Sequence, residues 1–452
     1  MKAINPSNGQ LIRNYKSHAF EDVQTILTHT QAAWNDWRQV DMEERSRLMH
    51  RAADILRSHH EEYALLMTRE MGKVISEARA EIEKCAWVCD FYADHAKNFL
   101  KDEMVETAAS KSFVAFEPLG IILAVMPWNF PFWQVFRFAA PALMAGNAGI
   151  LKHASNVPGC ALAIEQVFKE AGFPENIFRS LLIPARDVES VITDKRVKAV
   201  TLTGSEPAGM QVAAIAGREL KKTVLELGGS DPYIVLEDAN LPECIATAAQ
   251  ARMINTGQSC IAAKRFIVVE SLVKEFEKSL SQAMEGMKIG DPEDEQTQVG
   301  PMARPDLRDE LHNQVLQTLK QGGRLLTGGE PLEGPGAFYK PTVVTDVKQG
   351  MSLYNEETFG PVAAVIPVKD TEAAIQVAND SDFGLGGSLW TNDIIQGEAL
   401  ARRIESGAVF VNGMTVSDPR LPFGGIKRSG YGRELSHYGI REFVNIKSIW
   451  IK

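Results

Sequence analysis

Residues 198–229, KAVTLTGSEPAGMQVAAIAGRELKKTVLELGG, contain the pattern that decides the fold. The mainly apolar run Lys198–Leu202 predicts a buried strand, Ala208–Leu220 predicts a helix, and Thr223–Leu227 predicts the next strand. Strands joined by helices of about ten or more residues pair in parallel, with right-handed crossovers. The segment therefore predicts an α/β fold with a parallel sheet.

The same alternation continues on both sides of this segment. It predicts further strands at Ser112–Phe116, Ile121–Met126, Ala148–Lys152, Tyr233–Leu236, Arg265–Val269, Val362–Ile366 and Val409–Asn412, and helices at Gly159–Ala171 and Glu243–Ile254. Because the pattern occurs once before Glu226 and once after it, the sequence predicts two α/β domains.

The two ends of the chain differ from this central pattern. Apolar residues recur at a helical period over Phe20–Arg38, Arg45–Met71 and Val74–Leu100. Gly72 is the expected break between the second and the third of these segments. The tail Phe443–Trp450 alternates apolar and polar residues and predicts a terminal strand, for which a partner subunit is one candidate pairing surface.

Composition excludes several classes of protein. The 452 residues are 45% hydrophobic and 23% charged, which excludes a disordered or fibrous chain. The formal net charge of -10 argues against general binding to nucleic acid or to an anionic membrane surface. The residues after Met1–Pro6 are polar, unlike a signal peptide, and the most apolar stretch, Phe138–Leu151, is too short to span a membrane. We therefore expect a reduced, cytoplasmic protein.

One of the five cysteines lies in a setting unlike that of a structural cysteine. Cys85 and Cys89 are four residues apart on a predicted helix, which is more typical of helix packing than of a metal site, so we expect no metal. Cys260 ends the polar stretch Asn255–Cys260, NTGQSC. A cysteine in such a loop is accessible and easily activated, whereas a structural cysteine favours apolar neighbours. Cys260 is therefore a candidate nucleophile, with a structural cysteine as the alternative.

Two polar residues are candidates to assist Cys260. Glu226 ends an apolar strand just before Gly228-Gly229, where burial raises the pKa of a carboxyl group and suits it to act as a general base. Asn129 lies in Met126–Pro131, MPWNFP, and its amide can donate a hydrogen bond to a developing oxyanion. The alternatives are a surface glutamate at a sheet end and a packing turn.

A small-residue turn offers a place for phosphate. Thr203-Gly204-Ser205 connects a predicted strand to the helix that begins near Ala208, and a helix N-terminus after such a turn can bind phosphate. An ordinary strand-to-helix connection is the alternative. The Gly-rich dinucleotide loop, the Walker loop, the zinc-protease motif and the nucleophile elbow are absent, which disfavours P-loop, zinc-protease and α/β-hydrolase functions.

Five motifs follow one another along the chain: Pro127-Trp128-Asn129-Phe130-Pro131, Glu226-Leu227-Gly228-Gly229, Asn255-Thr256-Gly257-Gln258-Ser259-Cys260, Glu357-Thr358-Phe359-Gly360-Pro361 and Pro422-Phe423-Gly424-Gly425. Their order and spacing resemble the NAD(P)-dependent aldehyde dehydrogenase superfamily, from about Ile4 to the C-terminus. Ser230-Asp231-Pro232, the Ser417-Asp418 segment and the short length are similar to bacterial NAD(P)-dependent succinate-semialdehyde dehydrogenases of the YneI/Sad type.

The resemblance implies an aldehyde dehydrogenase-like fold with two Rossmann-type α/β domains. Residues 1–98 and 119–228 would form the dinucleotide-binding domain, and residues 229–438 the catalytic domain. Residues 99–118 and 439–452 would form a small β oligomerisation element that joins subunits into a homodimer or homotetramer.

The resemblance also implies a mechanism. Cys260 would attack an aldehyde, with Asn129 and the Cys260 backbone N–H holding the alkoxide. Hydride transfer to the nicotinamide would leave a thioester, and Glu226 would activate the water that hydrolyses it. The implied reaction is oxidation of succinate semialdehyde to succinate, and the alternative substrates are glutarate semialdehyde or an uncharged aliphatic aldehyde. A second cysteine two residues after the nucleophile is replaced by Ala262, so a disulfide switch there is not available.

The resemblance carries cofactor roles to nine positions: Met126, Trp128, Lys152, Ser155, Gly204, Ser205, Leu227, Glu357 and Phe359. Lys152 would meet the adenosine ribose, and Glu357 the nicotinamide ribose. Many NAD-selective relatives carry a glutamate where Ser155 stands. Because serine is neutral and short, we expect both NAD and NADP to be accepted.

The substrate carboxylate is expected to meet an arginine. Arg137 matches the arginine that succinate-semialdehyde dehydrogenases use, and a helix salt bridge is its alternative role. A second arginine of those enzymes is replaced here by Ile254. Arg420, otherwise a solvated loop residue, or Ser417 is the candidate replacement, with Phe423 nearby.

Two functions from other classes stay open at this point. A cysteine hydrolase would need a histidine partner, and none of the nine histidines falls in the five motifs. A non-catalytic binding protein is disfavoured by the joint presence of Cys260, Glu226 and Asn129.

Overall fold

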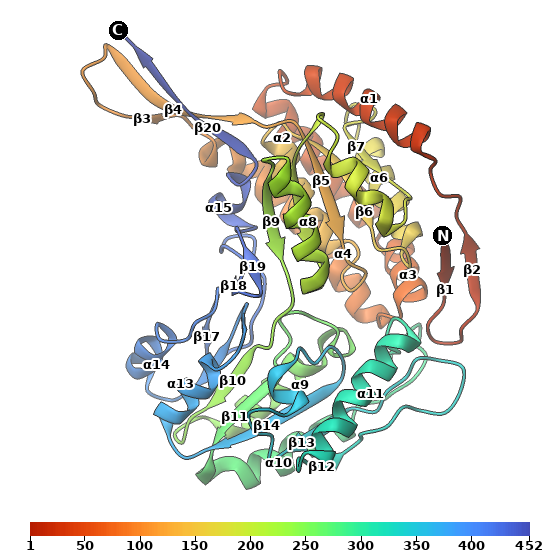
Figure 1. Ribbon diagram of the computed structural model, residues 1–452, viewed down its shortest axis with the longest axis vertical. Coiled ribbons are helices and arrows are strands. Elements are labelled where there is room, and N and C mark those ends of the chain that lie inside the picture. The colour runs from red at the N-terminus through yellow and green to blue at the C-terminus, as the bar shows by residue number, and fades with distance from the viewer.

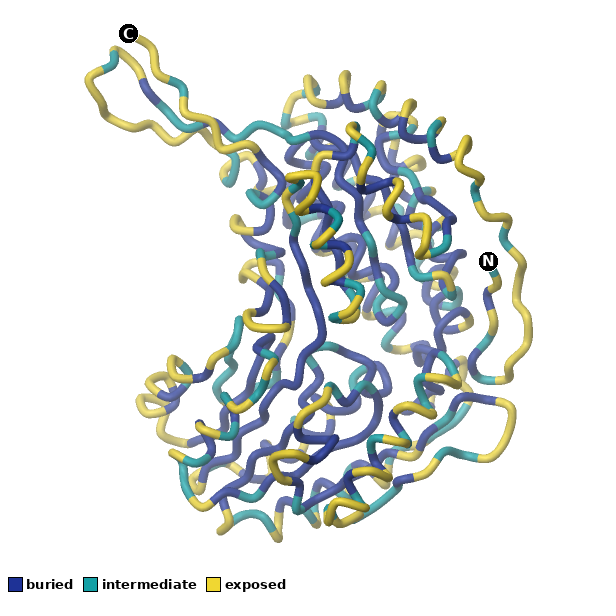
Figure 2. The backbone as a smooth tube through the Cα atoms, viewed as in Figure 1, coloured by how far each residue is buried: buried dark blue, intermediate teal, exposed yellow.

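The computed structural model describes residues 1–452 and contains two α/β bodies, one above the other in Figure 1, and a β-arm that projects from the upper body. The largest hydrophobic cluster lies in the upper, first body, and two smaller clusters lie in the lower, second body. Figure 2 shows that the strands of both bodies are buried along most of their length, whereas the arm is largely exposed.

The first body is built on a sheet of six strands in the order β19-β9-β8-β5-β6-β7, of which only β19 is antiparallel to its neighbour. Most residues of the central strands are buried, as expected for parallel strands that are covered on both faces. The strands are β5 (Ile121–Met126), β6 (Ala148–His153), β7 (Phe178–Ser180), β8 (Val197–Thr203), β9 (Lys222–Glu226) and β19 (Gly430–Tyr431).

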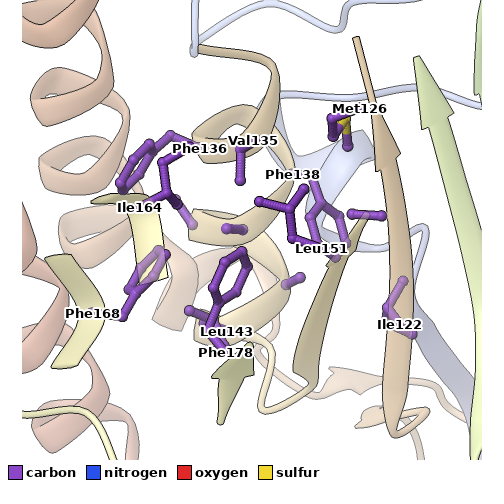
Figure 3. Packing of buried hydrophobic residues seen from close by; sticks show 14 of the residues in the cluster. Ile122, Met126, Val135, Phe136, Phe138, Leu143, Leu151, Ile164, Phe168 and Phe178 are labelled. Atoms are coloured by element: carbon purple, nitrogen blue, oxygen red, sulfur yellow. The ribbon is translucent and has the colours of Figure 1, made fainter. Parts of the chain in front are cut away.

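Eight helices accompany this sheet: α1 (Phe20–Trp37), α2 (Met42–Ser58), α3 (His60–Met71), α4 (Ile75–Phe99), α5 (Trp133–Met144), α6 (Pro158–Glu170), α7 (Val188–Ile192) and α8 (Glu206–Arg218). All 12 residues of α5 are buried, so this helix lies inside the core. Figure 3 shows its aromatic side chains between the strands and α6, where the rings of Phe136 and Phe168 lie 5.3 Å apart. The core therefore fixes the segment that follows the MPWNFP motif.

The second body is built on a sheet of seven strands in the order β12-β13-β14-β11-β10-β16-β17, of which only β12 is antiparallel. The strands are β10 (Pro232–Val235), β11 (Arg265–Val269), β12 (Arg324–Thr327), β13 (Thr342–Thr345), β14 (Val362–Val368), β16 (Ser388–Trp390) and β17 (Phe410–Val411). Its helices are α9 (Leu241–Met253), α10 (Glu270–Glu285), α11 (Pro305–Lys320), α12 (Ser352–Asn355), α13 (Thr371–Asn379) and α14 (Ile394–Ala401). The last helix, α15 (Ser436–Ile440), packs against α4 and α5 of the first body.

The arm consists of three antiparallel strands, β3 (Glu103–Met104), β4 (Lys111–Pro118) and β20 (Val444–Ile451). The terminal strand β20 pairs along its whole length with β4 of the same chain, from Val444 opposite Pro118 to Ile451 opposite Lys111. The predicted terminal strand is therefore present, and its pairing partner lies within the chain. Two short pairs complete the structure, β1 (Lys2–Ile4) with β2 (Leu11–Asn14) and β15 (Phe383–Gly384) with β18 (Ile426–Lys427).

Most predicted elements are present, with differences that have local causes. The predicted strands Ile121–Met126 and Arg265–Val269 have the same bounds in the structure. Gly72 adopts a left-handed conformation (φ 82°) and ends α3, as the sequence predicts. The predicted helix over 45–71 is two helices, because the chain turns at His59.

One short segment lies in a different sheet from the one that the predicted domain boundaries imply. Gly430–Tyr431 falls in the stretch predicted as the catalytic domain, but it forms β19 and pairs with β9 in the first sheet. The hydrogen bond from the Leu227 N–H to the Ser429 carbonyl (3.0 Å) extends this pairing. None of the helices combines the length and the apolar character that crossing a bilayer requires.

Candidate active site

A cavity of about 390 Å³ lies where the two bodies meet, and residues from four of the five motifs line it. In the first sheet, β6 and β7 follow β5 on one side, and the chain then returns to form β8 on the other side of β5. The strand order therefore reverses between β5 and β8. The carboxyl ends of the strands at such a topological switch point are where α/β sheets bind ligands. The cavity is lined from β5 by Pro127–Asn129 and from β8 by Thr203–Pro207. The second body contributes Cys260, Glu357 and one side of α11.

The loop before Cys260 has a constrained backbone. Asn255 and Thr256 both have left-handed conformations (φ 53° and 55°), which cost on the order of 1–3 kcal/mol each in non-glycine residues. The surrounding structure maintains them. The Asn255 N–H donates to the Glu77 carboxylate (3.0 Å to each oxygen), and its side-chain amide donates to the carbonyls of Asn129 (2.8 Å) and Gln258 (3.1 Å). The Asn255–Cys260 loop, called the nucleophile loop after the predicted role of Cys260, is therefore joined directly to the MPWNFP turn.

Gly257 is required at its place in this loop. Its φ is 73°, and a Cβ atom at this position would lie 2.2 Å from the Gly360 carbonyl oxygen. No larger residue fits that contact without moving the backbone. The contact places the NTGQSC segment against the ETFGP segment.

Cys260 is the one cysteine that is not fully buried, and it lines the cavity. Burial raises the pKa of its thiol, and the positive charges of Arg137 and Lys264 oppose this rise. The Lys264 ammonium donates to the carbonyls of Ser259 (3.1 Å) and Cys260 (2.6 Å). Since the thiolate is the reactive form of a cysteine, these two cations favour the form in which Cys260 could act as the predicted nucleophile.

Asn129 lines the same cavity as Cys260 and is almost completely buried. Its side-chain amide donates one hydrogen bond to the Gln258 carbonyl (3.1 Å). An amide group has two N–H donors, so one is left for a substrate oxygen. The structure therefore brings together the predicted nucleophile and the predicted oxyanion donor.

Glu226 ends β9 and is buried, as the sequence predicts, with neither carboxyl oxygen in a hydrogen bond. Burial raises its pKa well above the usual value, the neighbouring Glu434 carboxylate adds to the rise, and Arg137 and Arg433 oppose it. Its Oε1 lies beside Gly424, since a Cβ there would be 2.6 Å away, and Glu226 is not part of the cavity lining.

Six of the nine predicted cofactor residues line the cavity: Trp128, Gly204, Ser205, Leu227, Glu357 and Phe359. The rings of Trp128 and Phe359 lie 5.8 Å apart at 87°. Ser205 is the N-cap residue of α8, and its side chain makes no capping hydrogen bond. The Glu357 carboxylate accepts a hydrogen bond from the Gly229 N–H (2.9 Å) and lies 3.6 Å from the Lys264 ammonium.

The other three predicted cofactor residues do not line this cavity. Met126 belongs to the hydrophobic core, because β5 is still buried at that position (Figure 3). Lys152 is buried near the carboxyl end of β6, and burial lowers its pKa. Ser155 is exposed just beyond β6. Lys152 pairs in register with Val125, so it and Ser155 lie at the same edge of the sheet as the cavity.

Arg137 has a protein carboxylate as its partner in the structure. It is buried in α5, forms an ion pair with Glu434, and its guanidinium lies 4.5 Å from the centre of the buried Phe423 ring. The structure therefore favours the salt-bridge alternative over the predicted contact with a substrate carboxylate, because Glu434 occupies the arginine.

Arg420 lies on the surface, contrary to its predicted place in the substrate site. Its guanidinium binds the Asp418 carboxylate (2.6 and 2.9 Å) and lies 5.7 Å from the centre of the Trp87 ring. Ser417 is buried, and its hydroxyl accepts a hydrogen bond from the Lys84 ammonium (2.9 Å). Neither residue lines the cavity of Cys260.

Comparison with known proteins agrees with this geometry. The sequence profile described as "Aldehyde dehydrogenase family" matches residues 1–449. The chain belongs to the aldehyde dehydrogenase family. A probable succinate-semialdehyde dehydrogenase (NADP(+)) of Synechocystis sp. is 54% identical over 448 residues, which cover 99% of each chain. Succinate-semialdehyde dehydrogenase (NADP(+)) 1 of Mycobacterium ulcerans is 49% identical and covers 99% of this chain and 98% of its own.

A solved structure is similar over the whole chain. The succinic semialdehyde dehydrogenase of Streptococcus pyogenes in complex with NADP+ is 39% identical, covers 100% of this chain and 99% of its own, and has a TM-score of 0.98. These matches confirm the predicted family, fold class and enzyme class.

The sequence analysis did not predict several residues of this aldehyde dehydrogenase site. Lys264 acts on the charge state of Cys260, Glu434 acts on that of Glu226, and α11 lines one side of the cavity. Lys264 had a signal, since Lys264 and Arg265 are two adjacent charged residues directly before the apolar run Phe266–Val269, and such residues are rarely buried unless they are paired. Glu434 and α11 had none, because only the tertiary fold places them there.

Proposed function

We propose that this aldehyde dehydrogenase oxidises succinate semialdehyde to succinate, with NADP or NAD as the hydride acceptor. The observation that carries the proposal is the shared cavity, about 390 Å³ in volume, in which Cys260 and Asn129 meet the cofactor residues. Relatives at 54% and 49% identity bear the name succinate-semialdehyde dehydrogenase (NADP(+)).

The residues of the cavity fit a nicotinamide dinucleotide. The N-terminus of α8 suits a phosphate group, as does the hydroxyl of its N-cap residue Ser205, which makes no capping hydrogen bond. The Glu357 carboxylate suits ribose hydroxyls, and Trp128 and Phe359 offer aromatic faces. When bound, the nicotinamide ring supplies the hydride acceptor.

The residues of the chain perform the covalent chemistry. The Cys260 thiolate attacks the aldehyde carbon, and the carbonyl oxygen becomes an alkoxide that accepts hydrogen bonds from the remaining Asn129 N–H and the Cys260 backbone N–H. Departure of the hydride with its electron pair leaves a thioester at Sγ. Removal of either oxyanion donor costs on the order of 10²–10³ in rate.

Glu226 serves as the base of the second half-reaction. It takes a proton from the water that attacks the thioester, and succinate and the Cys260 thiol are released. A raised pKa gives the ionised carboxylate a high affinity for that proton. Because its carboxyl group lies outside the cavity lining, the proposal includes a rotation of the Glu226 side chain towards Cys260.

Steady-state kinetics test the proposal. Reduced-cofactor formation is measured with succinate semialdehyde, glutarate semialdehyde and butanal, each with NADP and with NAD. Succinate semialdehyde is expected to have the highest kcat/KM, and Cys260→Ser to abolish turnover, while Cys244→Ala, in the buried core, retains it. A preference for glutarate semialdehyde or butanal contradicts the proposed substrate.

We also propose that the arm joins subunits into a homodimer or homotetramer. A narrow β-ribbon is marginally stable in water, and this one exposes Ile446 and Trp450 by 62% and 57%. Light scattering of the Ile446→Lys/Trp450→Lys variant is expected to give the mass of one chain, and that of the unmodified protein a multiple of it. A single-chain mass for both proteins contradicts the proposal.

A further inference from the structure

A second cavity, of about 590 Å³, lies between α4 and α9. Phe130 and Trp133 line it, whereas Trp128 and Asn129 line the cavity of Cys260. The MPWNFP turn therefore forms a wall shared by the two cavities. Ile254, at the start of the nucleophile loop, also lines the second cavity.

The face of α4 that lines this cavity carries charge. Glu77, Glu81 and Lys84 follow one another at helical spacing, and all three line the cavity together with Glu295 from the second body. These three glutamates and one lysine give the lining a negative net charge if their hydrogen-bond and ion-pair partners in the protein are left out. Those partners decide which ligand the cavity can take.

Two of the acids bind groups of the protein. The Glu77 carboxylate accepts hydrogen bonds from the Asn255 N–H at 3.0 Å. The Glu295 carboxylate binds the Arg79 guanidinium through both oxygens at 2.7 Å.

The third acid is buried and fully occupied. Glu81 forms an ion pair with the buried Lys73. Its other oxygen accepts hydrogen bonds from the N–H groups of Phe132 and Trp133, both at 2.9 Å. Glu81 thus stabilises the N-terminus of α5 and offers nothing to a ligand.

Lys84 is different, because no carboxylate lies within ion-pair distance of it. Its ammonium donates one hydrogen bond to the Ser417 hydroxyl (2.9 Å) and lies 4.3 Å from the centre of the Trp133 ring. An ammonium group has three donors, so two are left. Burial, helped by the charge of Arg137, lowers its pKa to about 8, which a bound anion would reverse.

We propose that Lys84, together with the Ser417 hydroxyl, binds the carboxylate of the substrate in the second cavity. The inference rests on the proposed function, since it assigns a residue to the acid end of an aldehyde acid. It places the carboxylate on the far side of the MPWNFP turn from the cofactor residues. Arg137 and Arg420 are less suited, because Glu434 and Asp418 already bind them.

The ratio of two specificity constants tests this assignment. For each variant, kcat/KM is measured with succinate semialdehyde and with butanal, which has the same chain length and no carboxylate. The ratio of the two values does not depend on how much of a preparation is folded. Lys84→Met is expected to lower the ratio about 100-fold, mainly through KM for the acid, and Lys84→Arg to lower it less.

Two further variants complete the design. Ser417→Ala is expected to lower the ratio by a smaller factor than Lys84→Met. Lys97→Met removes an exposed lysine from the same helix, paired with Glu43, and is expected to leave the ratio unchanged. An unchanged ratio in both Lys84→Met and Lys84→Arg overturns the role of Lys84.

Unmodified enzyme distinguishes this outcome from failure of the proposed function. If it prefers butanal to succinate semialdehyde, the proposed substrate is wrong. If it prefers succinate semialdehyde and the Lys84 variants keep that preference, only the assignment of Lys84 is wrong.

Discussion

The Lys264 ammonium donates a hydrogen bond of 2.6 Å to the backbone carbonyl of Cys260, the proposed nucleophile. The lysine is buried, and its charge is among those that lower the pKa of the Cys260 thiol against the effect of burial. Lys264 thus both holds the loop that ends at Cys260 and favours the thiolate form of this cysteine.

Replacing Lys264 by methionine is expected to raise the pKa of Cys260. Removal of a nearby positive charge disfavours the thiolate, so alkylation by iodoacetamide at neutral pH should slow about tenfold, which corresponds to about one pKa unit. The rate is followed by mass spectrometry as a function of pH. Lys288→Met, at an exposed lysine paired with Asp294, is the control. An identical pH profile in Lys264→Met would show that the lysine does not act on the thiol.

The discrimination between an acid and an uncharged aldehyde is expected to depend on pH. Burial and then Arg137 lower the pKa of Lys84 to about 8, so its charge is present below that pH and is lost above it. The ratio of kcat/KM for succinate semialdehyde to that for butanal should fall about tenfold per unit above that pH. The other groups that act on Lys84 are Cys85, Glu81 and Asp418.

This ratio separates the effect of ionising Lys84 from the effect of ionising Cys260. Ionisation of Cys260 affects both aldehydes alike and cancels. Lys84→Arg stays charged over the range and should give a flat ratio. A flat ratio in the unmodified enzyme would contradict the prediction.

Ser155→Glu is expected to change cofactor selectivity. Ser155 is exposed and neutral at the edge of the sheet beside Lys152. A carboxylate there repels a 2′-phosphate, so kcat/KM with NADP should fall about 100-fold relative to NAD. Ser271→Glu, at an exposed position of α10, adds the same charge elsewhere and should leave the selectivity unchanged. Equal effects on kcat/KM with the two cofactors would contradict the assignment of Ser155 to the adenosine-binding site.

Gly257→Ala is expected to destabilise the protein and abolish turnover. The new Cβ would lie 2.2 Å from the Gly360 carbonyl oxygen, in a left-handed conformation, and we expect a loss of about 2–4 kcal/mol in the free energy of unfolding. Urea denaturation measures this loss. Gly217→Ala, in α8 with no atom within 4 Å of the added carbon, should instead stabilise by about 0.5–1 kcal/mol. Similar stabilities for the two variants would contradict the steric argument.

Local patterns in the sequence were sufficient for most of the fold. The strand β5 is a continuous apolar run, β11 is apolar after Arg265, and Gly72 ends a helix, so short-range physics predicts them. The presence of Cys260 and Asn129 in one cavity was also predictable, because their motifs combine polar side chains with constrained turns.

The charge partners were not predictable in the same way. Whether Arg137 meets a substrate or a protein carboxylate depends on Glu434, which only the tertiary fold brings to it. Lys84 and Ser417 are 333 residues apart in the sequence. Opposite charges attract whatever their spacing along the chain, so sequence alone does not tell which arginine is left for a ligand.

The single turn between the two cavities has a consequence for inhibition. A small dicarboxylate that fills only the chamber beside α4 would leave the dinucleotide free to bind, so its inhibition should be competitive with the aldehyde and not with NADP. An inhibitor that competes with both the aldehyde and NADP would have to occupy both cavities, and so be narrow enough to pass Asn129.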